Sequence, residues 1–157
     1  MMMKRLIIGM IFCVMMAGMT QVQAADKIDT KLIKEFINLH ATAIMQKDEP
    51  KLMAMFAENY RQLQSIKQPV IGKQDLAKMY KNNFLMAKLI MTQATIEEEN
   101  IAEDGQSATI RVHFSHRYLF EYEGQQKLLD QQEDWLSDLV LQQGQLQYLK
   151  TQKLLFK

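Results

Sequence analysis

Residues 108–122 alternate between two kinds of side chain, and few folds can accommodate such a run. Every second position belongs to one, mostly apolar set, namely Ala108, Ile110, Val112, Phe114, His116, Tyr118, Phe120 and Tyr122. The positions between them are mostly polar. A period of two predicts one long β-strand with a buried face and a solvated face. This pattern is typical of an antiparallel sheet that is covered on one side. The chain is therefore predicted to have an α+β fold, with helices elsewhere in the sequence covering the apolar face of this strand.

Three amphipathic helices are predicted upstream of the strand. The first spans about residues 30–46 and carries His40 in the middle of its apolar stripe. The second spans about 49–57 and begins after Asp48, a residue type that caps helix N-termini well. The third spans about 73–85. These helices supply the apolar surface that the alternating strand requires.

Further strands and turns complete the expected antiparallel sheet. A short strand is predicted at 60–66, followed by a turn at 69–72 and, after the third helix, by a long strand at 88–101. Asp104-Gly105 then leads into the alternating strand, and another strand follows from about Gln126. After the last turn, at Gln143-Gly144, a final strand spans about 146–156.

A two-residue turn at Glu123-Gly124 would fix the register of the next strand. The opposed pairs would be Tyr118 with Leu129, His116 with Gln131, Phe114 with Glu133, and Val112 with Trp135. This register carries Glu133 and Trp135 to the apolar face and places Glu133 diagonal to His116. A hydrogen bond between the Glu133 carboxylate and the His116 imidazole is then geometrically possible.

The first 24 residues have the organisation of a secretory signal peptide. Two basic residues precede an apolar run over about 6–19, and Val22-Gln23-Ala24 has the small residues that a signal peptidase reads. The apolar run is too short for a good transmembrane span, which needs about 20 residues. We expect cleavage after Ala24, a periplasmic or secreted protein with no membrane attachment afterwards, and a single domain over residues 25–157.

Composition narrows the range of partners. Loss of Lys4 and Arg5 with the leader leaves 17 basic against 18 acidic residues, a formal charge of −1. This balance argues against nucleic acid or an anionic membrane surface as a partner. Cys13 is the only cysteine, so the mature domain relies on its core rather than on disulfides. No nucleophile motif, phosphate loop, dinucleotide fingerprint or metal-ligand spacing is present, and no cofactor or metal is predicted.

The order of elements, together with several short segments, resembles the nuclear transport factor 2-like superfamily, which includes ketosteroid isomerase, scytalone dehydratase and polyketide cyclases. The segments are Gln46-Lys47-Asp48, Met55–Tyr60, Ile71-Gly72-Lys73, Asp104–Thr109 and Glu133-Asp134-Trp135. The resemblance implies a cone, in which a strongly curved sheet wraps around three N-terminal helices and a pocket opens between them. It also implies a homodimer through the outer face of the sheet.

The resemblance implies roles for individual residues as well. The oxyanion-donor tyrosine of ketosteroid isomerase falls on His40, its aspartate base falls near Gln64, and its protonated aspartate falls near Glu133. An amide cannot act as a base, so the isomerase mechanism does not transfer as it stands. Scytalone dehydratase-like sites use histidines and a carboxylate inside the cone, and His40, His116 and Glu133 are candidates for such a set.

Two functional hypotheses follow. In the first, the domain binds an apolar or aromatic small molecule, with or without acid–base chemistry of the isomerase, dehydratase or cyclase kind. Its candidate catalytic residues are His116, Glu133 and His40, and its candidate ligand-binding residues are Tyr80, Phe114, Tyr118 and Trp135. In the second, these side chains are satisfied core residues, and the domain is a non-catalytic interaction or dimerisation module.

Overall fold

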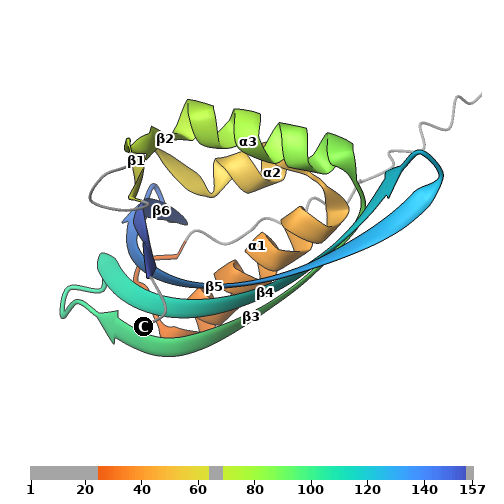
Figure 1. Ribbon diagram of the computed structural model, residues 1–157. Helices are drawn as coiled ribbons and strands as arrows, with labels where there is room; N and C mark the ends of the chain where they lie inside the picture. The colour runs from red at the N-terminus through yellow and green to blue at the C-terminus, as the bar shows by residue number, and fades with distance from the viewer. Residues whose placement is uncertain (1–24, 64–68, 155–157) are drawn as a thin grey trace, which may run out of the picture.

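The computed structural model describes residues 25–63 and 69–154, which form a mixed α+β domain (Figure 1). The expected signal peptide, Gln64 and residues 155–157 lie outside the described residues. The helices are α1 (Thr30–Gln46), α2 (Glu49–Ala54) and α3 (Lys73–Met86). Within the described part of the chain, no helix is long and apolar enough to cross a membrane.

Helix α1 forms where the sequence predicts it. Asp29 caps its N-terminus, because the Asp29 carboxylate accepts a hydrogen bond of 2.7 Å from the Leu32 backbone N–H. At the other end Lys47 takes a left-handed conformation with φ of 55°, and its ammonium donates to the backbone carbonyls of Ala87 and Lys88. The apolar stripe of α1 is buried, with His40 in its middle. The end of this helix is thus tied to the start of the first long strand.

Helix α2 ends earlier than predicted. It stops at Ala54, because the chain leaves the helix to bury Phe56 and Tyr60 on strand β1 (Phe56–Leu63). The strand predicted at 60–66 therefore begins four residues sooner, and its last expected residues lie outside the described ones. Ile71–Gly72, predicted within a turn, forms the short strand β2 against β1.

The long strands follow the prediction closely. They are β3 (Ala87–Ile101), β4 (Ser107–Tyr122), β5 (Gln125–Gln142) and β6 (Gln145–Leu154). The sheet order is β2-β1-β6-β5-β4-β3, and its pairs are antiparallel except for the parallel pair β1–β6. All four register pairs predicted between β4 and β5 are confirmed. Glu123 and Gly124, with φ of 50° and 75°, make the two-residue turn that sets this register.

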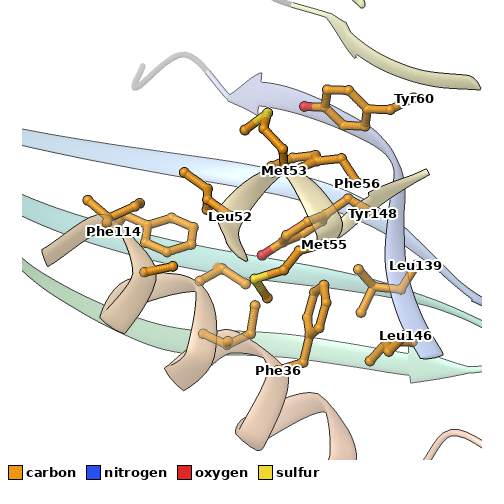
Figure 2. Close-up of a cluster of buried hydrophobic side chains, with 14 of the residues drawn as sticks. Phe36, Leu52, Met53, Met55, Phe56, Tyr60, Phe114, Leu139, Leu146 and Tyr148 are labelled. Atoms are coloured by element: carbon orange, nitrogen blue, oxygen red, sulfur yellow. The ribbon is translucent and has the colours of Figure 1, made fainter. Parts of the chain in front are cut away.

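The helices lie on one side of the sheet, and the long strands bend beneath them in Figure 1. On the covered face of β4, Ile110, Val112, Phe114 and His116 are all buried. Figure 2 shows the core that forms between the layers, where Phe36 of α1 and Phe56 of β1 pack with Tyr148 of β6. The alternation in the sequence thus correctly predicts which face of β4 meets the helices.

Two turn glycines with similar backbone conformations should lose different amounts of folding stability when each is replaced by alanine. Gly105 and Gly124 have φ of 68° and 75°, where a Cβ atom costs roughly 1–2 kcal/mol. An added Cβ at Gly124 meets nothing within 4 Å, whereas at Gly105 it would lie 3.0 Å from Cβ of Lys27. We expect Gly105→Ala to lower the free energy of unfolding more than Gly124→Ala in urea titrations. Equal losses would show that Lys27 moves away without cost.

Candidate functional site

Two adjoining cavities lie between the helices and the sheet. The inner chamber has a volume of about 60 Å³ and is lined by residues of α1, α3 and strands β1, β4, β5 and β6. The outer vestibule has a volume of about 170 Å³ and shares His116, Glu133, Trp135 and Tyr80 with the chamber. His40 and Phe114 line the chamber alone, and Tyr118 lines the vestibule alone. Each of the seven candidate site residues from the sequence therefore lines at least one of these two adjoining cavities.

His40 reaches the chamber from the buried stripe of α1. Its Nδ1 lies 2.7 Å from the Tyr148 hydroxyl, and its Nε2 is buried with no hydrogen-bond partner among the described residues. Burial, together with a smaller contribution from nearby His116, lowers the pKa of His40 to about 3, so the imidazole is neutral. Burial also raises the pKa of Tyr148, which keeps its phenol protonated. If Tyr148 donates to Nδ1, the His40 proton must sit on Nε2, toward the chamber.

His116 lies on the inner face of β4, at the boundary of the two cavities. Its Nδ1 lies 3.0 Å from the Thr92 hydroxyl of β3, and its ring stacks on Phe114 with centroids 5.7 Å apart. Burial lowers the pKa of His116, and Lys153 acts in the same direction, while Glu133 opposes them. The imidazole is therefore neutral near pH 7 and can accept or donate a proton within the site.

Glu133 does not form the hydrogen bond to His116 that the register made possible. Its carboxylate instead accepts from the amide of Gln131, from the ammonium of Lys153 and, at 3.0 Å, from the indole N–H of Trp135. Burial alone raises the pKa of Glu133, but the bonds from Lys153 and Trp135 outweigh it and hold the pKa below its usual value. A charged carboxylate with three donors is a fixed negative charge beside His116 rather than a proton carrier.

The aromatic candidates have different surroundings. Phe114 sits between the two histidines, with its ring centroid 5.3 Å from that of His40. Burial raises the pKa of Tyr80, so its phenol stays protonated at the chamber wall. The indole N–H of Trp135 donates to Glu133, and the ammonium of Lys153 lies over the Trp135 ring, 5.9 Å from its centroid. These side chains line the space and also belong to the packed core around it.

Several residues of the site were not anticipated from the sequence. Tyr60 of β1 and Thr151 of β6 share a hydrogen bond of 2.5 Å at the chamber wall, beside Ser137 and Gln62. They meet only because β1 pairs in parallel with β6, a non-local contact. The register of β5 and β6 also shifts by one residue between Asp138 and Leu139. This irregularity puts Tyr148 and Thr151 on the same face, which strict alternation along β6 would not.

The side chains that the sequence placed on the opposite face lie there. His113 Nδ1 is 2.7 Å from the Asp134 carboxylate, which also accepts from Arg111 at 3.3 Å. Arg117 pairs with Asp130 at 2.6 Å. Among the residues that the structure describes, no cluster of three or more His, Cys, Asp or Glu side chains could hold a metal ion.

No protein-family model matches the chain, and comparison with curated proteins gives no match. Solved structures with the same fold are numerous. A conserved protein from Planctomyces limnophilus is 18% identical with a TM-score of 0.69, over 78% of this chain and 91% of that one. A ketosteroid isomerase-like protein from Erwinia carotovora atroseptica is 17% identical with a TM-score of 0.60, over 80% and 96%. An NTF-2-like protein of unknown function from Shewanella oneidensis is 12% identical with a TM-score of 0.62, over 80% and 98%.

At these identities the likeness concerns the fold alone. The chain has the nuclear transport factor 2-like fold, as the resemblance in the sequence implied. This fold hosts unrelated functions, so function has to be argued from the side chains of the site.

Burial of a neutral His40 makes stability depend on pH in a defined direction. The unfolded chain binds a proton at His40 below about pH 6.5, whereas the folded chain does so only near pH 3. Folding stability is therefore complete above pH 6.5 and falls on acidification, by about 2 kcal/mol at pH 5 from this residue. We expect His40→Gln to lose less stability than the wild type between pH 7.5 and pH 5 in urea unfolding. Equal losses would mean that His40 accepts a proton in the folded state.

Proposed function

We propose that this protein is an exported small-molecule-binding domain whose ligand occupies the chamber and vestibule. In this proposal α1, α2 and α3 with the curved sheet form the cone of the superfamily, and the two cavities are its pocket. The observation that carries the proposal is the buried His40 Nε2, which has no partner among the described residues. A buried polar atom left unpaired costs about 1–3 kcal/mol, a cost that a polar group of a ligand in the chamber would remove.

The lining defines the class of ligand. Phe114, Tyr80 and Trp135 favour a flat apolar or aromatic body. The neutral imidazoles of His40 and His116 favour an uncharged polar group, such as a carbonyl or hydroxyl, over a fully charged one. The chamber is small, so we infer that one ring or a short polar end of the ligand occupies it and that the rest lies in the vestibule.

The same arrangement supports acid–base chemistry of the isomerase, dehydratase or cyclase kind. With Nδ1–H donated to the Thr92 hydroxyl, Nε2 of His116 is a lone pair that can take a proton from a carbon next to a carbonyl. The electron pair then moves to the carbonyl oxygen, which His40 Nε2–H stabilises. The charge of Glu133 favours the imidazolium that forms on His116. His116 would return the proton to another atom of the substrate, which restores the site.

A non-catalytic interaction module is the second candidate function. It is favoured by large apolar side chains that are exposed on the outer face of the sheet, near the β4–β5 turn and at the start of β3, namely Leu128, Leu89 and Met91. A monomer rarely leaves a contiguous apolar patch uncovered. In this reading the sheet mediates homodimerisation and the histidines are core residues.

Ligand-induced stabilisation separates the two candidates. We expect 2-naphthol or 1-indanone, tested at rising concentration, to increase the melting temperature of the wild type; saturation at about 100 times Kd corresponds to about 2.7 kcal/mol. His116→Gln should abolish the increase while keeping the circular dichroism spectrum. The matched control is His113→Gln, the same change on the same strand but on the outer face, and it should keep the increase. No increase with the wild type, together with unfolding of His116→Gln, would support a core histidine.

Export is tested at the N-terminus of the protein. Expressed in a Gram-negative host, the full chain should be found in the periplasmic fraction, with Ala25 as its first residue by intact-mass spectrometry. Substitution of Ala24 by a bulky residue should block cleavage after it, because signal peptidase requires a small residue there. A cytoplasmic protein of full mass would contradict the proposal.

A further inference from the structure

The vestibule has an unusual lining for a ligand pocket. Such pockets are mostly apolar, with a small number of polar groups that orient the ligand. In the vestibule, polar side chains instead arrive from several elements, namely Asn83 of α3, Gln62 of β1, Gln131 and Glu133 of β5, and Lys153 of β6. Covering them with an apolar group would cost free energy, because their hydrogen bonds to water would be lost. The part of a ligand that fills the vestibule is therefore expected to be polar.

The two charges of this lining compensate each other. The Lys153 ammonium donates to the Glu133 carboxylate, which also accepts from Gln131 and Trp135. The side chains of Lys153 and Glu133 are only 33% and 12% exposed. A charged ligand group would have to compete with this pair, and separating it would leave a partly buried charge uncompensated. The polar part of the ligand is therefore expected to be uncharged.

The amides of the vestibule have free hydrogen-bonding capacity. Gln62 accepts from the Tyr60 hydroxyl at 3.3 Å through its side-chain oxygen, and its N–H groups have no acceptor among the described residues. Neither the Asn83 amide nor the Tyr118 hydroxyl bonds to another described side chain. An amide offers two donors and an acceptor, and a ligand hydroxyl group can serve either as acceptor or as donor. Several hydroxyl groups on the ligand would match this lining.

Aromatic rings lie beside these amides. Tyr80 and Trp135 line both cavities, and Tyr118 lines the vestibule. A polyhydroxylated ring, such as a sugar, has C–H groups on its faces and hydroxyl groups around its edge. It can therefore contact an aromatic side chain and bond to amides at the same time.

We propose that the ligand is an uncharged glycoside of a flat aromatic group, with its sugar ring in the vestibule and its aromatic ring toward the chamber. This inference rests on the proposed function, because it divides the same ligand between the same two cavities. The polar end of the aromatic group meets Nε2 of His40, and the sugar hydroxyls meet Asn83 and Gln62. The larger volume of the vestibule, about 170 Å³ against about 60 Å³, suits the bulkier sugar ring.

Three derivatives of hydroquinone test the proposal, and each keeps one free phenol hydroxyl for the chamber. The mono-β-glucoside adds a sugar, the monocyclohexyl ether adds a ring of the same size without hydroxyls, and the monomethyl ether adds no ring. We expect the wild type to bind the glucoside at least about tenfold more tightly than the cyclohexyl ether in isothermal titration calorimetry, because only the glucoside satisfies the amides. An apolar vestibule would give the reverse order, since the cyclohexyl ring is the more hydrophobic.

Two matched substitutions locate the sugar. Asn82 and Asn83 are exposed neighbours on α3, and only Asn83 lines the vestibule. We expect Asn83→Leu to lower the preference for the glucoside over the cyclohexyl ether by about fivefold, because it removes an amide that bonds to the sugar. Asn82→Leu should leave this preference unchanged. Circular dichroism spectra like that of the wild type would show that both variants keep the fold.

The outcomes distinguish this inference from the proposed function. Binding of the methyl ether without a preference for the glucoside leaves the proposed function standing and overturns the glycoside. Stabilisation by 2-naphthol without any binding of the glucoside has the same meaning. A preference that Asn83→Leu does not reduce, or that both substitutions reduce equally, places the sugar elsewhere and also overturns the inference. If neither these ligands nor 2-naphthol and 1-indanone bind, the proposed function itself fails.

Discussion

The register between β4 and β5 is the constraint on which the rest of the structure depends. Because side chains alternate faces, a slip of one residue would move His116 to the solvent and bring Arg117 into the core. The two-residue turn at Glu123-Gly124 removes this freedom, since both residues hold the left-handed conformation that the turn needs. Once β4 is fixed, its inner face determines what α1 must cover, and His40 and His116 come to the same cavity.

Electrostatics at that cavity follow from burial. Both histidines stay neutral because burial disfavours the charged imidazolium and lowers the pKa of each ring. Glu133 stays charged because Lys153 and Trp135 bond to it directly. The result is a negative charge held a short way from two neutral imidazoles, each with a hydroxyl at Nδ1. Neutral imidazoles of this kind suit the uncharged polar ligand of the proposed function better than a bare ion.

Much of this architecture could be predicted from the sequence, because it is local. The period of β4, the cap at Asp29 and the turn at Glu123-Gly124 act over a few residues, and they give the helix, the strand and its register. What could not be predicted depends on non-local or irregular contacts. The parallel pairing of β1 with β6 brings Tyr60 to Thr151, and the shifted register of β6 turns Tyr148 inward. Glu133 was placed on the correct face, but its bond to Lys153 depends on that same shift, which alternation does not reveal.

The buried polar pair of His40 and Tyr148 has a free-energy cost that an apolar core would avoid. A phenylalanine at position 148 and an apolar residue at position 40 would fill the same space without a buried unpaired nitrogen. Such replacement of both partners of a buried hydrogen bond is often neutral or stabilising. A domain that depends on its core alone, with no disulfide, nevertheless keeps His40 on the otherwise apolar stripe of α1 and Tyr148 of β6 bonded to it. Packing gives no reason for this pair, and the unpaired Nε2 of His40 is the atom to which the proposed ligand would bring a partner.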